Sequence, residues 1–171
     1  MSELPQPDEI PGLEVRFTEE SDDKYLQQWL MDPSLGKAFP MYDVAEVTDA
    51  VSRWISFARF KCSLTVTMYG VPCGLATLYL QPYRKLAHQT EFGIIISNEF
   101  RGKGVGGFLM TSLMRLAKEQ FRIELIHLQV HAENPAIKFY QRYGFREFGR
   151  QNCWMKEDGS FIGRVFMERF L

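Results

Sequence analysis

Residues 101–107, Arg-Gly-Lys-Gly-Val-Gly-Gly, are the part of the sequence whose residue types point most clearly to chemistry. A nucleotide pyrophosphate needs several convergent backbone N–H groups, and glycines let its oxygens approach the main chain. The apolar run Ile94–Ile96 before the segment predicts a buried strand, and the helical spacing of Leu109, Leu113 and Leu116 after it predicts a helix. The segment therefore predicts a pyrophosphate cradle that ends on a helix N-terminus.

Two other phosphate-binding motifs match this segment in part. Gly102, Gly104 and Gly107 satisfy a literal GxGxxG, the fingerprint of dinucleotide-binding folds, and Glu133 is available as the ribose acid. That fold needs repeated parallel β-α-β units, whereas the residues before the segment predict an antiparallel hairpin. A Walker A loop needs Ser or Thr after Gly-Lys, where this sequence has Gly104. A dinucleotide site and a glycine-rich turn without a ligand stay open as alternatives.

Hydrophobic periodicity predicts four strands and two helices before the segment. The strands are expected over residues 13–18, 64–69, 73–80 and 89–96. The first helix begins at Ser21 or Asp22 and ends before Pro33, and Asp43 with Glu46 opens the second as a variant of the capping box. Gly70-Val71-Pro72 predicts the turn of an antiparallel hairpin.

After the segment the pattern alternates between helices and strands. A helix is expected over about residues 106–120 and a strand over 125–130, which together predict a parallel β-α-β unit. A short helix over about 135–143 has Asn134 as its N-cap and Gly144 as its stop signal. Two further strands, 145–150 and 161–169, are joined across residues 156–159. The resulting order, β-α-α-β-β-β-α-β-α-β-β, predicts an α/β (α+β) fold.

The sequence resembles the GNAT superfamily of N-acetyltransferases in two signatures. The first, R/Q-x-x-G-x-G/A, is matched by Arg101, Gly104 and Gly106. The second is matched at the family's spacing by Asn134, Ala136, Tyr140 and Gly144-Phe145. The motifs cover Glu91 to Phe145, and the element order extends the resemblance over almost the whole chain. Gly107 departs from the pattern, because relatives often carry a larger or polar residue there.

The resemblance implies a fold and a cofactor site. The fold is a mixed, mostly antiparallel central sheet of about seven strands with helices on both faces and a splayed parallel pair, the fourth and fifth strands. Acetyl-coenzyme A would lie along the fourth strand, with its pantetheine amides bonded near Ile94 and Ile96 and its thioester polarised by the Ile95 N–H. Its pyrophosphate would be held by the loop residues Arg101, Gly102, Lys103, Gly104, Val105 and Gly106, and its pantetheine arm also by Asn134.

Acetyl transfer to an amine needs a neutral amine, a donor to the carbonyl oxygen and a proton for the departing thiolate. The resemblance assigns the general base to Glu91, for which a solvated or salt-bridged strand carboxylate is the alternative. It assigns proton donation to the thiolate, or a contact with its sulfur, to Tyr140, which is otherwise a core aromatic. Relatives mostly transfer the acetyl group directly in a ternary complex. The sequence predicts neither a covalent acetyl-cysteine nor a metal site.

Composition sets further limits. The chain has 171 residues, 46% apolar and 24% charged residues, and a formal net charge of -1, so it has no global field to draw it to nucleic acid or an anionic membrane. Three cysteines without CxxC spacing favour a reducing compartment, and no apolar run is long enough to span a membrane. We expect a cytoplasmic protein with a flexible segment over 1–12 and one domain over 13–171. A homodimer is compatible with the sequence.

The acceptor is the least constrained part of the prediction. Residues 90–96 and 101–104 resemble the branch with polyamine acetyltransferases and the enzymes that acetylate N-termini of ribosomal proteins. A small amine (polyamine, amino acid or amino sugar) ranks first and a peptide N-terminus second, with a non-catalytic acyl-CoA-binding module as the third hypothesis. Four acids could meet a cationic amine or serve only as helix caps and solvated charges: Asp32, Asp43, Glu46 and Asp49.

Overall fold

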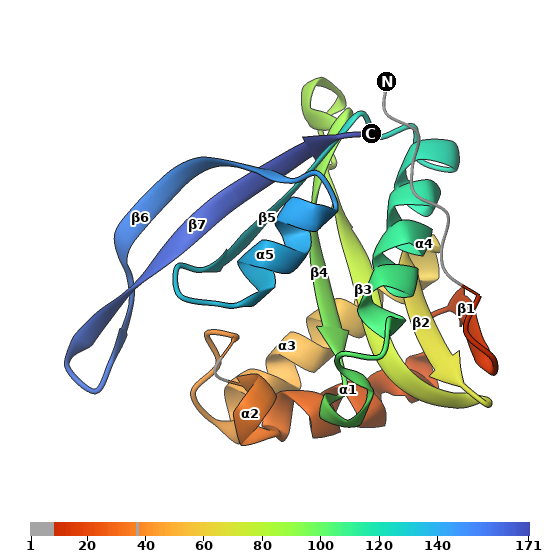
Figure 1. Ribbon diagram of the computed structural model, residues 1–171, viewed down its shortest axis with the longest axis horizontal. Helices are drawn as coiled ribbons and strands as arrows, with labels where there is room; N and C mark the ends of the chain where they lie inside the picture. The colour runs from red at the N-terminus through yellow and green to blue at the C-terminus, as the bar shows by residue number, and fades with distance from the viewer. Residues whose placement is uncertain (1–8, 37) are drawn as a thin grey trace.

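A seven-stranded sheet in the order β1-β2-β3-β4-β5-β7-β6 forms the centre of the protein (Figure 1). The computed structural model describes residues 9–36 and 38–171. The strands are β1 (Leu13–Phe17), β2 (Ser63–Met68), β3 (Val71–Leu80), β4 (Gln89–Ile96), β5 (Leu125–His131), β6 (Arg146–Glu157) and β7 (Ser160–Phe170). All neighbouring strands pair antiparallel except β4 and β5, which are parallel. The predicted fold class is confirmed.

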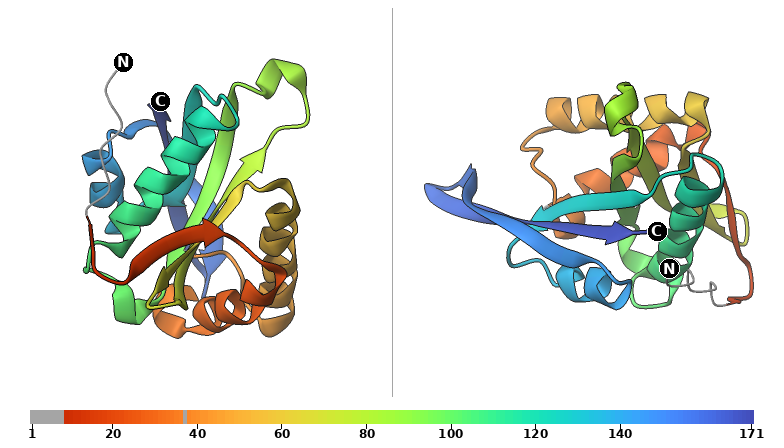
Figure 2. Two further views of the ribbon diagram at one scale, coloured as in Figure 1. Left: turned by 90° about the vertical axis from the view of Figure 1, so that its right-hand side faces the viewer. Right: turned by 90° about the horizontal axis from the view of Figure 1, so that it is seen from above.

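Helices cover both faces of this sheet. They are α1 (Asp23–Met31), α2 (Pro33–Gly36), α3 (Val44–Ser56), α4 (Val105–Glu119) and α5 (Ala136–Arg142), with short 3-10 turns η1 (Glu20–Asp22), η2 (Phe57–Phe60), η3 (Arg84–Leu86) and η4 (Asn98–Phe100). Figure 2 shows α1 and α3 on one face and α4 and α5 on the other, while the β6–β7 hairpin projects beyond the body. The sheet is thus the middle of three layers.

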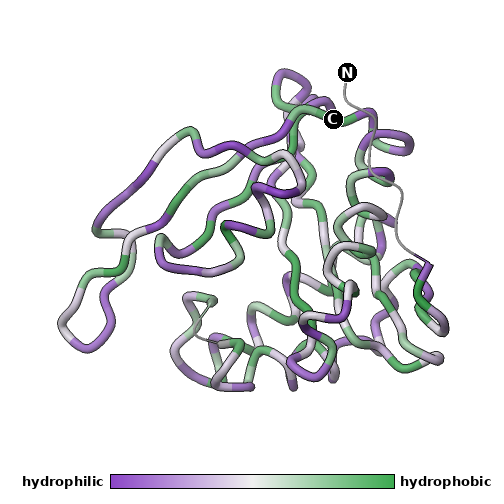
Figure 3. The backbone as a smooth tube through the Cα atoms, in the orientation of Figure 1, coloured by the Kyte–Doolittle hydropathy of each residue, from purple (hydrophilic) through white to green (hydrophobic). Residues whose placement is uncertain are grey.

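Two hydrophobic clusters fix the layers. Leu109 and Leu113 of α4 are fully buried against one face, and Trp54 of α3 packs with Leu75 and Ile95 against the other. Each such side chain contributes roughly 1.5–3 kcal/mol when it leaves water. Figure 3 shows hydrophobic residues along β4, whereas the β3–β4 connection and the tip of the β6–β7 hairpin are largely hydrophilic.

The predicted helix cap at Asp43 is present. The backbone N–H of Glu46 donates to Oδ1 of Asp43 over 2.9 Å. The Glu46 carboxylate reaches back one residue further than a standard capping box, and accepts the N–H of Tyr42 over 2.6 Å. Both acids therefore have a structural role at the start of α3.

Two hairpin turns differ from the sequence prediction. The β2–β3 turn is Tyr69–Gly70, both at positive φ, and not residues 70–72. Pro72 instead lies within β3, opposite Thr67 where the register shifts, and a bulge is one of the few strand positions that tolerate proline. The strand expected over 145–150 continues as β6 to Glu157. The β6–β7 turn is correspondingly only Asp158–Gly159, both also at positive φ.

The N-terminal segment predicted over residues 1–12 lies mostly outside the described residues. Of the described part, Ile10 packs against the core on the α4 side, and its carbonyl accepts the N–H of Leu13 over 3.0 Å. The flexibility of this segment and the single domain over 13–171 stay predictions. Within residues 9–36 and 38–171, no helix is both long and apolar enough to cross a membrane.

Candidate active site

The parallel pairing of β4 and β5 ends halfway along both strands. It covers Gln89 to Glu91, where the partner of Glu91 is His127, and beyond that point the strands diverge (Figure 1). From Phe92 to Ile96, β4 pairs only with β3. Because successive backbone groups of a strand point to alternate sides, half of those in this stretch face the open edge. The predicted pantetheine residues Ile94, Ile95 and Ile96 all lie here.

The glycine-rich loop follows directly from this open edge. Gly102 and Gly104 have φ of 72° and 84°, a left-handed conformation that residues with a Cβ adopt only with strain. A Cβ built on Gly102 would meet no atom within 4 Å, so open space adjoins the turn. Helix α4 begins at Val105, and its first N–H groups have no acceptor within the helix. These features fit a pyrophosphate.

Arg101 connects the loop to β4. Its Nε donates to the carbonyl of Ile96 over 3.3 Å. Burial lowers the pKa of the Arg101 guanidinium, while the nearby charges of Asp32 and of the Tyr140 phenol act in the opposite direction. Lys103 is exposed and lies over the ring of Phe100, 5.5 Å from its centroid. Both cations of the predicted loop therefore lie at the N-terminal end of α4.

Helix α5 packs closely against the start of α4. A Cβ on Gly106 would lie 3.7 Å from Ile96 and Phe139, which is ordinary contact. A Cβ on Gly107 would lie 2.1 Å from the hydroxyl oxygen of Tyr143. At the glycine that departs from the family pattern, a side chain would therefore require the Tyr143 hydroxyl to move.

Tyr140 lies in an aromatic cluster on the α4 side of the sheet. Its ring packs edge-on against Phe92, Phe139 and Phe145, with centroids 6.3, 5.5 and 5.9 Å away. Burial raises the pKa of Tyr140 to about 12, although the charge of Arg101 partly opposes the shift. The phenol is therefore protonated at neutral pH and able to donate.

Asn134 caps α5, as the sequence predicts. Its Oδ1 accepts the N–H of Ala136 over 2.9 Å. The helix itself is counted from Ala136, so Pro135 stands one position before the expected helix start. The contact of Asn134 with the pantetheine arm stays a prediction.

Glu91 lies on the opposite face of β4 from the Tyr140 cluster. It shares its face with Gly93 and Ile95, which lie under α3, and its carboxylate Oε1 accepts the side-chain N–H of Gln129 over 2.7 Å. Because Phe92, the next residue, contacts Tyr140, both catalytic candidates lie at the point where β4 and β5 separate. An acetyl group held at this opening would be accessible to both.

Three side chains on the Glu91 face of the sheet, of which Gln129 contacts Glu91, escape prediction from the sequence. Gln129 on β5, Arg164 on β7 and Trp154 on β6 adjoin one another on the same face of the sheet. The polar alternation of His127, Gln129 and His131 indicates a half-buried strand with one polar face, which is the only signal available. Their grouping depends on the strand register, which the sequence does not contain.

Tyr79 and His127 are the register partners of Glu91 on either side. Burial raises the pKa of Tyr79, and the charge of Glu91 adds to the shift. Burial lowers the pKa of His127, although Glu91 and Glu168 act in the opposite direction. A protonated phenol and a neutral imidazole therefore flank the carboxylate at neutral pH.

The remaining candidate residues lie apart from this opening. Cys62 and Cys73 are buried and donate to backbone carbonyls, whereas Cys153 is exposed. Among residues 9–36 and 38–171, no cluster of three or more His, Cys, Asp or Glu is placed to hold a metal ion. Asp32 accepts two hydrogen bonds from Ser34, and Asp49 pairs with Arg53, so each of these acids has a structural partner.

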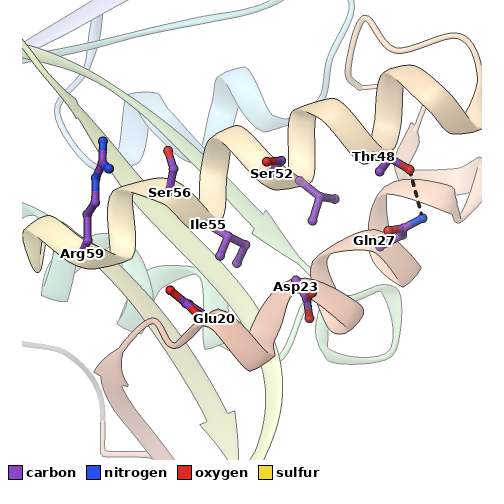
Figure 4. A pocket seen from close by; sticks show the side chains of 9 residues that line it. Glu20, Asp23, Gln27, Thr48, Ser52, Ile55, Ser56 and Arg59 are labelled. Carbon is purple, nitrogen blue, oxygen red and sulfur yellow. Dashed lines mark hydrogen bonds between the residues drawn. The ribbon is translucent and has the colours of Figure 1, made fainter.

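A surface pocket of about 470 Å³ lies elsewhere, between α1 and α3 (Figure 4). Most of the residues that line it are polar or charged, and the side chain of Gln27 donates to Thr48 across it over 3.4 Å. The pocket shares no residue with the β4–β5 opening or the glycine-rich loop.

Comparison with known proteins agrees with this geometry. Residues 17–145 match the model of the acetyltransferase (GNAT) family. An L-amino acid N-acetyltransferase from Escherichia coli K12 is 28% identical over 107 residues, which are 62% of this chain and 66% of that protein, just under two thirds of its length.

Solved structures show the same fold. Ribosomal-protein-alanine N-acetyltransferase from Brucella melitensis superposes with a TM-score of 0.76 at 20% identity, covering 92% of this chain and 99% of that one. The protein yncA from Salmonella typhimurium, solved with its cofactor acetyl-CoA, superposes with a TM-score of 0.80 at 16% identity, covering 94% of each chain. By its matching family model, its fold and its two signatures, the chain belongs to the GNAT family of acetyltransferases.

Proposed function

We propose that this chain transfers the acetyl group of acetyl-CoA to a small primary amine, by direct attack while both substrates are bound. The observation that carries the proposal is the convergence of three features at one opening. The glycine-rich loop and the unpaired edge of β4 adjoin it, and Glu91 and Tyr140 approach it from opposite faces of the sheet.

Acetyl-CoA, when bound, supplies an acetyl group activated as a thioester. The N–H groups at Val105 and Gly106 and the charges of Arg101 and Lys103 would hold its pyrophosphate. Backbone groups at Ile94 and Ile96 would hold the pantetheine amides. The N–H of Ile95 would donate to the carbonyl oxygen, where negative charge develops.

Glu91 and Tyr140 divide the proton transfers between them. Glu91 takes a proton from the acceptor ammonium, directly or through a water molecule, which leaves a nucleophilic amine. The amine nitrogen bonds to the acetyl carbon, the carbon–sulfur bond breaks, and the nitrogen releases its second proton to water, which leaves the neutral amide. Tyr140, which is protonated at neutral pH, gives its phenolic proton to the departing sulfur and regains a proton from water.

A small amine is favoured as the acceptor because the E. coli relative is named an L-amino acid N-acetyltransferase. The Brucella protein is named a ribosomal-protein-alanine N-acetyltransferase, but at 20% identity it resembles this chain in fold alone. A peptide N-terminus is therefore the second candidate, and the acceptor panel below distinguishes the two.

The test combines a binding measurement with a turnover measurement. Acetyl-CoA at 100 times its Kd should raise the free energy of unfolding by about 2.7 kcal/mol, seen as a thermal shift. Release of free CoA is then followed with a thiol reagent across amines and peptides. The Cys153→Ser variant is the suitable background, because the exposed Cys153 would itself react with the reagent.

Each outcome has a defined meaning. Absence of any thermal shift with acetyl-CoA would contradict the proposed cofactor site. A shift without turnover on any acceptor would instead identify a non-catalytic acyl-CoA-binding module. Turnover with peptides alone would replace the small amine by a protein N-terminus.

A further inference from the structure

A chain of polar side chains runs from Glu91 across the outer strands of the sheet. Nε2 of Gln129 donates to Glu91, and Oε1 of the same amide accepts from Nη1 of Arg164. Nε of Arg164 donates to Oε1 of Gln151 over 2.9 Å. A single amide group therefore separates the carboxylate of the proposed general base from a guanidinium.

Arg164 is held in place by two aromatic rings and two glutamine side chains. Its guanidinium lies over the rings of Trp154 and Phe166, 5.1 and 4.6 Å from their centroids. Among the described residues, the salt bridges within 4.0 Å involve other arginines. Its bonds to Gln129 and Gln151 use two of its five N–H donors, so others remain for an anion. A fixed, half-buried arginine of this kind suits bidentate binding of a carboxylate.

His131 adds a second indication of a ligand at this place. It is the register partner of Arg164, and its ring lies edge-on to Trp154 with centroids 5.2 Å apart. Within the described part of the chain, its Nε2 is buried and has no hydrogen-bond partner. A buried polar atom without a partner is costly, and a bound ligand would supply the missing hydrogen bond.

We propose that Arg164 binds a carboxylate of the acceptor, so that the acceptor is an amino acid or a similar compound with a primary amine and a carboxylate a few bonds apart. This inference rests on the proposed function of Glu91 at the same opening. With the amine at Glu91 and the carboxylate at Arg164, the ligand would lie across Gln129.

The other acceptor classes suit this arrangement less well. A polyamine carries a second cation, which Arg164 would repel at the position where it meets the ligand. The N-terminal residue of a peptide has an amide in place of its α-carboxylate, and an amide cannot accept the bidentate, charge-assisted bond of a carboxylate. The acceptor's carboxylate is therefore the group to test.

The experiment compares free L-amino acids with their carboxamides, together with spermidine and a tetrapeptide, as acceptors. CoA release is measured with saturating acetyl-CoA. We expect free amino acids to be acetylated with higher kcat/KM than their carboxamides. In Arg164→Gln, KM for the amino acid should rise on the order of 10- to 100-fold, while KM for the carboxamide changes little. Arg164→Lys keeps the positive charge, so its KM for the amino acid should lie between those of Arg164→Gln and the unmodified protein.

The matched control is Arg150→Gln on the same hairpin. Arg150 is the register partner of the buried Val165, so it lies on the other face, where it pairs with Glu147. This variant should keep the KM of the unmodified protein. The acetyl-CoA thermal shift, measured on every variant, reports whether each is folded and binds the cofactor.

The outcomes separate this inference from the proposed function. Acetylation of spermidine or the peptide in preference to amino acids would leave the acetyltransferase intact and overturn the role of Arg164. An equal rise in KM for amino acids and carboxamides in Arg164→Gln would also overturn it, because an arginine with only a structural role would affect both acceptors alike. Binding of acetyl-CoA with no turnover on the panel would identify a non-catalytic module and overturn both the proposed function and the role of Arg164. Failure to bind acetyl-CoA refutes the proposed function itself.

Discussion

Glu91 and Tyr140 lie on opposite faces of the sheet at the β4–β5 opening, and their surroundings differ. Glu91 accepts a hydrogen bond from Gln129 on the face that also carries His127 and Arg164. Tyr140 is enclosed by aromatic rings on the opposite face. A carboxylate beside polar groups can accept a proton, and a phenol in apolar surroundings stays protonated until a strong base such as a thiolate forms beside it. The two proposed roles in proton transfer can be tested by changing a single atom of each side chain.

Glu91→Gln should lower kcat/KM by at least about 100-fold, because a positioned general base contributes about that much or more. The glutamine retains the shape and can still bond Gln129, so the fold should be unchanged. The measurement is CoA release as a function of pH, with Glu14→Gln on the far edge strand β1 as the control. An unchanged high-pH plateau together with an unchanged pH profile would rule out Glu91 as the base.

Tyr140→Phe should lower kcat by about 100-fold with little change in acetyl-CoA affinity, because only the proton donor is removed. With the pKa of Tyr140 at about 12, its deprotonation should cause no loss of kcat between pH 7 and 10. Tyr83→Phe, at an exposed tyrosine, is the control. A kcat equal to that of the unmodified protein would remove Tyr140 from the mechanism.

At the scale of elements, the contact between α4 and α5 fixes the shape of the loop. Gly107→Ala should destabilise the protein by about 1–3 kcal/mol and weaken acetyl-CoA binding, because the new Cβ would lie 2.1 Å from the Tyr143 hydroxyl. Urea unfolding measures the first effect and calorimetric titration the second. Gly149→Ala is the control, since its Cβ would meet nothing nearer than 3.6 Å.

A double-mutant cycle tests whether this clash is the cause. Removing the hydroxyl in Tyr143→Phe leaves the nearest ring atom 3.3 Å from the Cβ of residue 107. The double variant should therefore be more stable than the sum of the two single changes predicts, by more than about 0.5 kcal/mol. Additive effects would mean that the cost of Gly107→Ala arises elsewhere in the loop.

Local signals predicted most elements but misplaced two turns. The cap at Asp43 and the helix after the glycine-rich loop follow from short-range patterns, and both are present. Pro72 suggested a turn because proline usually interrupts strands, yet a bulge between β2 and β3 accommodates it. The predicted strand over residues 145–150 also stopped short of the end of β6. Its exposed residues show little hydrophobic alternation, and β7 supplies its pairing.

At the scale of the whole molecule, two buried thiols link stability to alkaline pH. Burial raises the pKa of Cys62 and of Cys73 from about 9 to about 11. Well below pH 9, both thiols are protonated in the folded and in the unfolded protein. As pH rises further, only the unfolded chain releases them readily, so the folded state loses stability. Urea unfolding should show a loss on the order of 1 kcal/mol per thiol by pH 10.

The slope of stability against pH identifies the source of this loss. Cys62→Ala combined with Cys73→Ala should flatten it between pH 8.5 and 10, whatever fixed cost the smaller side chains add. Cys153→Ala should leave the slope unchanged, because that thiol is exposed. A slope that persists in the double variant would place the alkaline sensitivity in other groups.

The sequence by itself determined the features that depend on neighbouring residues. The glycines at 102 and 104, the caps at Asp43 and Asn134 and the family signatures are local, because backbone conformation and hydrogen bonds within a few residues decide them. They were sufficient for the fold class and for a cofactor loop.

Only the tertiary structure decided which distant side chains meet. Glu91, Gln129 and Arg164 come together because the β4–β5 and β5–β7 registers align three separate segments on one face. The need for glycine at 107 likewise comes from Tyr143, a residue of the chain far beyond it. Strand register and helix packing are long-range choices among many sterically allowed pairings, and no single stretch of sequence specifies them.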